Sequence, residues 1–210
     1  MEVFYLPGFA SGPSSTKAQA FAAHLASRGV TVECLDLRKP SFEHLRLSAM
    51  IDHVRASLRG DTILIGSSLG GLTAARVAER DERVKALVLL APAFRLVHRW
   101  QEQLGTEWDD WKRTGWREVF DYSKNGPSKI SFGFIDDALA LGTDLPNVMA
   151  RSLVIHGTRD EIVPIEYSRE LAQLHPDNVT LIEVDDGHQL LGSIPRLLAE
   201  SDRFLAPLLE

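Results

Sequence analysis

The chain has 210 residues, of which 44% are hydrophobic and 25% charged, and this composition is typical of a single globular domain. The formal net charge of -6 argues against nucleic acid or an anionic membrane as the main partner, because clustered lysines and arginines bind both. The single cysteine, Cys34, excludes a disulfide framework and a cysteine-ligated zinc site.

The N-terminal stretch "MEVFYLPGFA" has neither a basic region nor a long apolar region, so we expect no signal peptide. No apolar run approaches the length of a membrane span. We therefore expect a cytoplasmic protein without a membrane partner.

Six short apolar runs alternate with amphipathic segments along the chain. The runs are rich in β-branched and aliphatic residues, and several lack alternation, which is typical of parallel strands buried on both faces. The alternation predicts an α/β fold with a mostly parallel sheet and helices on both faces. The expected strands are residues 3–6, 30–35, 62–65, 86–90, 152–156 and 180–184. Helices are expected over residues 17–28, between the candidate cap Ser41 and Gly60, and after Ser193.

The segment from residue 94 to residue 148 interrupts this rhythm, because it holds no convincing buried strand. It is too long for a plain connection, and we predict a mostly helical lid inserted between two parts of the core, residues 1–93 and 149–210. All four tryptophans lie in it, and two interpretations stay open: they contact the substrate, or they form a small core of the insertion. They are Trp100, Trp108, Trp111 and Trp116.

The stretch "TILIGSSLGGLTAARVAE" reads as a strand, a glycine-rich turn and a helix. The turn has the spacing G-x-S-x-G around Ser68, whereas Ser67 has no glycine two residues away on either side. Such a turn strains the backbone of its central residue and lifts the hydroxyl clear of the sheet. We therefore predict that Ser68 is a nucleophile.

A serine nucleophile needs a base, and the base needs an acid that orients it. Asp160 follows the expected strand 152–156, and His188 follows the expected strand 180–184. The order Ser68, Asp160, His188 is that of nucleophile, acid and base in this type of sheet, and all three follow strand ends, where ligands bind. His156 is predicted to be a packed or hydrogen-bonded structural histidine.

Two backbone N–H groups must also face the negative charge that develops on the substrate. We expect one from Leu69, directly after the nucleophile, and the other from Phe9, in the loop after the first strand. This loop also reads as a turn that leads into a helix.

Four stretches in order, "LPGF", "GSSLGG", "GTRDEIVP" and "DGH", make the chain resemble the α/β-hydrolase superfamily. The run "YLPGFASGPSSTKAQAF" is similar, more narrowly, to the small YqiA-type esterases. The resemblance implies a serine esterase for short acyl esters or thioesters, without a metal or other cofactor. It assigns the nucleophile, acid and base to Ser68, Asp160 and His188, and the oxyanion donors to Phe9 and Leu69.

The sequence departs from this resemblance at two places. Pro7 stands where a histidine is usual before the glycine, and the tryptophan-rich insertion is longer than the smallest members need. The main hypothesis is a hydrolase of small carboxylic esters. Hydrolysis of a thioester or a C–C bond by the same triad stays open, as does a non-catalytic binding module. The sequence does not indicate an oligomeric state.

Overall fold

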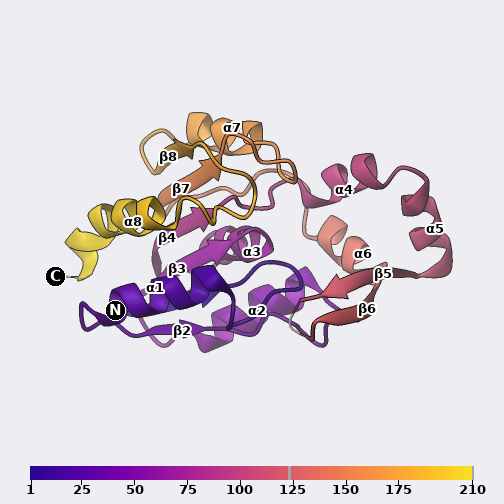
Figure 1. Ribbon diagram of the computed structural model, residues 1–210, viewed down its shortest axis with the longest axis horizontal. Helices are drawn as coiled ribbons and strands as arrows, with labels where there is room; N and C mark the ends of the chain where they lie inside the picture. Colours follow the sequence, from indigo (N-terminus) through magenta and orange to yellow (C-terminus); the bar gives the residue numbers. More distant parts are fainter. Residues whose placement is uncertain (123, 210) are drawn as a thin grey trace.

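The computed structural model describes residues 1–122 and 124–209 (Figure 1). Six parallel strands form the central sheet in the order β2-β1-β3-β4-β7-β8, so each expected strand is present and the predicted fold class is confirmed. Their bounds are β1 (Glu2–Leu6), β2 (Val32–Cys34), β3 (Thr62–Ser67), β4 (Val84–Leu90), β7 (Arg151–Gly157) and β8 (Val179–Val184).

Helices cover both faces of this sheet. Side chains of a strand alternate between faces, so Val3 and Tyr5 of β1 pack on one side while Phe4 and Leu6 pack on the other. The first side is covered by α1 (Thr16–Ala26) and α8 (Ile194–Leu209). The second is covered by α2 (Leu47–Ser57), α3 (Leu69–Ala78) and α7 (Glu166–Leu174).

The start of α2 differs from the prediction. Ser41 does not cap this helix, because its hydroxyl instead accepts the His44 N–H inside a separate turn, at 3.3 Å. The helix begins at Leu47 without a cap from its own preceding residue. A carboxylate far along the chain replaces that cap: Asp137 Oδ2 accepts the Ser48 N–H at 2.8 Å.

Residues 94–148 form five elements that lie together to one side of the sheet (Figure 1). The predicted helices are accompanied by a two-stranded antiparallel hairpin that was not expected, because the less exposed positions of its strands are mostly polar and give no clear apolar pattern. The elements are α4 (Leu96–Leu104), α5 (Thr106–Thr114), β5 (Trp116–Asp121), β6 (Gly126–Ser131) and α6 (Gly133–Ala140).

The insertion shares the core of the α2 and α3 side of the sheet. Phe134 and Ile135 of α6 are fully buried there, and α6 packs against α2. The division into a core and a lid stays a prediction. None of the helices in the described part of the chain has both the length and the apolar character needed to cross a membrane.

Candidate active site

Ser68 occupies the sharp turn between β3 and α3. Its backbone has φ 51° and ψ -114°, a region that residues with a side chain rarely adopt and that is held only where the surroundings enforce it. A Cβ at Gly70 would lie 2.0 Å from the Leu6 carbonyl oxygen, and one at Gly66 would lie 2.5 Å from the Gly70 carbonyl oxygen. The glycines on both sides of Ser68 are therefore required by close backbone packing.

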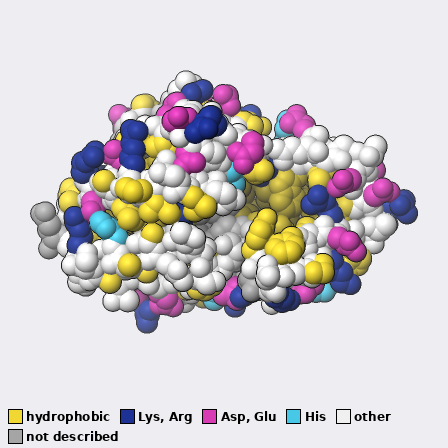
Figure 2. All heavy atoms as spheres, in the orientation of Figure 1, with side chains coloured by type: hydrophobic (Ala, Val, Ile, Leu, Met, Phe, Trp, Pro, Cys, Tyr) yellow, Lys and Arg dark blue, Asp and Glu magenta, His cyan; other side chains and the backbone are white. Residues whose placement is uncertain are grey.

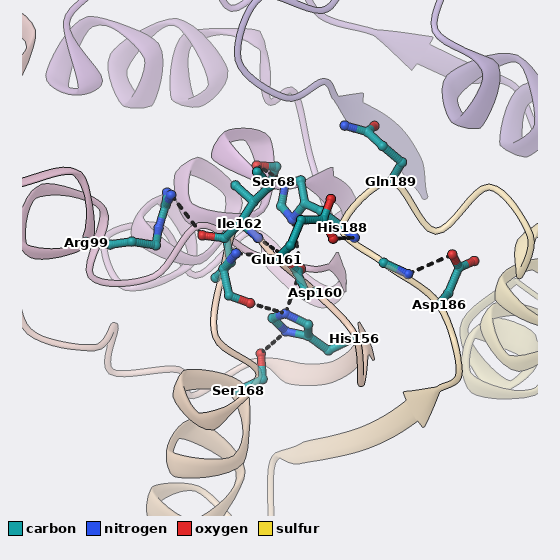
Figure 3. A network of polar contacts seen from close by, with 12 residues as sticks. Ser68, Arg99, His156, Asp160, Glu161, Ile162, Ser168, Asp186, His188 and Gln189 are labelled. Atoms are coloured by element: carbon teal, nitrogen blue, oxygen red, sulfur yellow. Dashed lines mark hydrogen bonds and ion pairs between the residues drawn. The ribbon is translucent and has the colours of Figure 1, made fainter. Parts of the chain in front are cut away.

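The three predicted side chains meet in one hydrogen-bonded chain (Figure 3). Ser68 Oγ lies 3.0 Å from His188 Nε2, and His188 Nδ1 lies 2.8 Å from Asp160 Oδ2. The Asp160 side chain is fully buried, and that of His188 is 8% exposed. Each residue follows the carboxyl end of a parallel strand, which explains how the sheet brings distant segments together.

Asp160 is held in its charged form by the loop around it. Its Oδ1 accepts the N–H groups of Ile162 at 2.9 Å and Val163 at 2.8 Å. Burial alone raises the pKa of Asp160, but hydrogen bonds from His156 and His188 and from the Val163 N–H outweigh it, so that this pKa is held below its ordinary value. An ionised Asp160 favours the tautomer of His188 that carries a proton on Nδ1 and leaves Nε2 free to accept one.

His156 is hydrogen-bonded, as predicted, but one of its partners was not foreseen. Its Nε2 lies 3.0 Å from both Asp160 Oδ2 and the Val163 carbonyl oxygen, and its Nδ1 lies 2.7 Å from Ser168 Oγ. Since a carbonyl only accepts, Nε2 carries a proton and is a second donor to Asp160. The four-residue spacing from Asp160 was the available signal, because a tight turn between the two residues brings their side chains together.

The neighbouring carboxylates have other contacts. Asp185 pairs with Arg159 on the surface, and Asp186 accepts the Gly187 N–H. Glu161 Oε2 accepts the backbone N–H of His188 at 3.3 Å. Neither these two aspartates nor Glu161 hydrogen-bonds the His188 ring, so Asp160 is its carboxylate partner among the described residues.

The two expected oxyanion donors lie beside Ser68. Leu69 is the first residue of α3, where helical N–H groups have no partner within the helix. The loop that carries Phe9 lies against the nucleophile, since a Cβ at Gly8 would be 3.4 Å from Ser68 Cβ. Within residues 1–122 and 124–209, neither the Phe9 nor the Leu69 N–H donates to another backbone group. Their role as oxyanion donors stays a prediction.

A cavity of about 730 Å³ opens at Ser68 and His188. Figure 2 shows it as a hollow lined largely by hydrophobic side chains. Its apolar wall includes Phe9, Leu69, Leu96, Trp100, Leu104, Ile162 and Leu191. Polar side chains that sequence reasoning did not identify also line it: Lys17, Arg99, Gln103, Arg117, Tyr122 and Gln189. In the described part of the chain, no cluster of His, Cys, Asp and Glu side chains is arranged to hold a metal ion.

The structure separates the four tryptophans. Trp100 lines the cavity, but Trp108 and Trp111 are buried and pack with Phe132 inside the insertion. Trp111 also donates its Nε1–H to the Ile130 carbonyl, at 3.0 Å. Trp116 lies on the hairpin under the Lys129 ammonium, 4.3 Å from its ring centre. Trp108, Trp111 and Trp116 do not line this cavity: the insertion uses two of them for its own core and carries the third on its hairpin. Their predicted contact with the substrate stays a prediction.

Solved structures with the same fold include several hydrolases. Alpha/beta hydrolase domain-containing protein 10 from mouse is 24% identical with a TM-score of 0.80, covering 99% of this chain and 90% of that one. Est1E from Butyrivibrio proteoclasticus, solved with ferulic acid bound, is 21% identical with a TM-score of 0.81, covering 98% and 88%. An esterase domain from Rhodothermus marinus is 19% identical with a TM-score of 0.63, covering 99% and 85%.

At these identities the structural comparisons establish the fold. No curated protein matches the sequence. The sequence does match a family over nearly its whole length, at residues 2–204, and that family is described as "Uncharacterised protein family (UPF0227)". Together with the parallel sheet and the serine turn, this match shows that the chain is an α/β-hydrolase-fold protein that belongs to the UPF0227 family.

Proposed function

We propose that this protein is a serine hydrolase that cleaves carboxylic esters of small molecules. The observation that carries the proposal is the chain from Ser68 Oγ through His188 to Asp160, at a strained turn that opens into a cavity. A non-catalytic binding module has no need of this arrangement. The distance of 3.0 Å between His188 Nε2 and Ser68 Oγ is already within the range for proton transfer.

Acylation begins when Ser68 Oγ attacks the ester carbonyl and His188 Nε2 takes the hydroxyl proton. Asp160 holds the ring in place and stabilises the imidazolium that forms. The protonated Nε2 then gives its proton to the leaving alcohol oxygen, and the acyl group stays on Ser68. In the second half of the reaction, water loses a proton to Nε2 and attacks the acyl carbonyl. Ser68 regains its proton as the acid leaves.

The N–H groups of Phe9 and Leu69 stabilise the oxyanion in both halves of the reaction. Each such donor is worth roughly 3–4 kcal/mol of barrier. Pro7 orders the Phe9 loop by fixing a backbone angle. The esterases that the sequence resembles have a histidine at this position, and its side chain orders the loop instead.

The insertion is the lid of the cavity in this proposal, with Trp100 as the tryptophan that contacts the substrate. Est1E, which shares the fold, was solved with ferulic acid, and an aromatic acyl group also suits a cavity walled by Phe9 and Trp100. The same triad would serve for a thioester or an activated C–C bond. Rates for a panel of p-nitrophenyl esters, acyl-coenzyme A thioesters and β-diketones would rank the three bond types.

Labelling by a fluorophosphonate tests the nucleophile directly. The probe should react with the wild-type protein and with Ser67→Ala, because both keep the Ser68 hydroxyl beside His188. It should not react with Ser68→Ala. Equal labelling of Ser68→Ala would overturn the assignment, and absence of labelling in the folded wild-type protein would overturn the proposed function.

A further inference from the structure

The side chains that line the cavity beside Ser68 include three cations and no carboxylate. The chain as a whole is acidic, with 29 Asp and Glu against 23 Lys and Arg. Among the described residues that line the cavity, however, Lys17, Arg99 and Arg117 are basic and none is Asp or Glu. The lining therefore has the opposite charge balance from the rest of the protein, and it favours anions.

Arg99 is the most unusual of the three. It lies on α4 and is 4% exposed, and its Nη1 donates to Gln103 Oε1 at 3.2 Å and to the Ile162 carbonyl at 3.1 Å. Its Nε–H is buried and has no partner. Burial lowers the pKa of Arg99 to about 10, against the attraction of Asp160, so the guanidinium is still charged at neutral pH.

Three other arginines of the described chain show what is missing at Arg99. Arg55, Arg76 and Arg117 also have a buried Nε–H without a partner. Each of these three nevertheless forms an ion pair, with Asp81, Glu79 and Glu107 respectively. Arg99 forms none with any described residue. A buried charge without a counter-ion is costly, and such a group is normally paired with an anion.

The free edge of the Arg99 guanidinium has the geometry for a carboxylate. Nη1 is used by protein acceptors, which leaves Nε–H and Nη2 without protein partners. Two parallel N–H groups of this kind match the two oxygens of a carboxylate. Figure 3 shows Arg99 reaching towards the loop that carries Asp160, on the opposite side of Ser68 from Gln189.

Lys17 has a different task. Its Nζ donates to the Gln189 carbonyl at 2.7 Å and so holds the loop directly after His188. In Figure 3, Gln189 and Arg99 lie on opposite sides of Ser68.

We propose that Arg99 binds a carboxylate on the substrate, so that the preferred ester is an anion with an apolar body beside the scissile bond. Arg117, which faces the same cavity, adds a second positive charge. This inference rests on the proposed esterase function and narrows its substrate class. The carboxylate could belong to the acyl group or to the leaving alcohol, and two substrate pairs distinguish these positions.

The first pair is mono-p-nitrophenyl adipate against p-nitrophenyl hexanoate, which places the carboxylate in the acyl group. The second is 3-acetoxybenzoate against phenyl acetate, which places it in the leaving group. The wild-type protein should prefer the anion in one pair. In Arg99→Met, kcat/KM for that anion should fall about 10- to 100-fold more than for its neutral counterpart, mainly through KM. Arg99→Lys should recover part of the preference.

Arg113→Met is the matched control, because Arg113 lies on the exposed surface of α5, pairs with Asp110 and does not line the cavity among the described residues. It should keep the wild-type ratio in both pairs. A wild-type protein that cleaves both neutral esters as fast as the anions, or an Arg99→Met ratio equal to that of wild type, would overturn the carboxylate site while the esterase proposal stands.

Binding to Ser68→Ala separates the two proposals if no ester is cleaved. Calorimetry should show tighter binding of the anion in one of two pairs, monomethyl adipate against dimethyl adipate or 3-acetoxybenzoate against phenyl acetate. This difference should disappear in Ser68→Ala combined with Arg99→Met. Equal binding within both pairs by Ser68→Ala would overturn the carboxylate site even if neither Arg99 variant folds. The wild-type fluorophosphonate reaction reports on the nucleophile independently of the substrate.

Discussion

Two imidazoles share one oxygen of Asp160. His188 Nδ1 and His156 Nε2 both lie within 3.0 Å of Oδ2, while the loop N–H groups occupy Oδ1. His188 reaches outwards to Ser68, whereas His156 is fully buried and reaches inwards to Ser168 on α7. In the proposed mechanism His156 is thus a positioning residue, because it reaches Ser68 only through Asp160.

Replacing His156 should expose this role. His156→Leu removes one donor from Asp160 and leaves the Val163 carbonyl with an unmet bond, so we expect unfolding to become easier by about 2–4 kcal/mol. Loss of the hydrogen bond should also raise the pKa of Asp160. The acid limb of the fluorophosphonate labelling rate should then move to higher pH, together with a lower urea midpoint.

His98→Leu is the control for this change, since His98 is exposed on α4 and pairs with Glu102, outside the polar network around Asp160. It should leave the urea midpoint and the labelling profile as in the wild type. An unchanged acid limb in a folded His156→Leu protein would show that His156 supports the fold without acting on Asp160.

The sequence could predict the geometry of Ser68, Asp160 and His188 because each follows a strand of a parallel sheet, and strand ends meet at one edge. It could not predict the role of Arg99. The position of Arg99 on an amphipathic helix does not reveal that its side chain is buried. Nor does it reveal that no described carboxylate pairs with the guanidinium. Both depend on how α4 packs against the Asp160 loop.

At the scale of single elements, α3 can start where it does only because of Gly70. A methyl group there would lie 2.0 Å from the Leu6 carbonyl oxygen of β1, and neither backbone can move without disturbing the sheet. Gly70→Ala should therefore lower the free energy of unfolding by more than about 3 kcal/mol and abolish labelling of Ser68.

Gly12→Ala is the matched substitution, because a Cβ at Gly12 meets no atom within 4 Å and lies in the loop after the same strand. Urea unfolding of the two variants compares them directly. A Gly70→Ala protein as stable as Gly12→Ala would contradict the close approach of α3 to β1.

The first turn of α2 depends on the insertion for its cap. Asp137 of α6 accepts the Ser48 N–H and the Ser48 hydroxyl, and its negative charge also suits a helix N-terminus. Asp137→Ala should cost about 1–2 kcal/mol in urea unfolding. The neighbouring Asp136→Ala should cost much less, because Asp136 is exposed. Equal losses in both variants would show that the contact contributes little.

Sequence patterns explain why α2 was only partly predictable. Leu47 and Ile51 have helical spacing, so the helix itself was expected, but Ser41 has the chemistry of a cap and misplaced its start. The true cap comes from Asp137, which local patterns cannot detect. Likewise, the less exposed positions of β5 and β6 include Arg117, Asp121 and Ser128, so these strands lack the apolar alternation that identifies a strand.

At the scale of the whole molecule, the burial of Lys17 should make the free energy of unfolding vary with pH in the alkaline range. Burial lowers the pKa of Lys17 to about 8 from an ordinary value of 10.5, although Asp160 and Asp186 oppose the shift. Between these two values the unfolded chain binds the extra proton and the folded protein does not. The free energy of unfolding should therefore rise with pH in this window, by up to about 3 kcal/mol.

Lys17→Met isolates this contribution. Burial raises the pKa of Cys34 to about 11 and that of Tyr5 still further, so these groups reduce stability as the pH passes their ordinary values. Both proteins contain them, and their effect cancels in the difference. The stability of the wild type relative to Lys17→Met should increase from pH 8 to pH 10.5 in urea unfolding. If the difference in the free energy of unfolding stayed constant over this pH range, burial would not lower the pKa of Lys17.

The Ile162 carbonyl links helix α4 to the loop that carries Asp160. It lies two residues after Asp160 and accepts hydrogen bonds from two side chains of α4, Arg99 and Gln103, both at 3.1 Å. If α4 moves outwards to admit a substrate, both bonds must break, and the loop that carries Asp160 is freed at the same moment. In the proposed function, we therefore expect an outward movement of α4 to change the contacts of the Asp160 loop as well as access to the cavity.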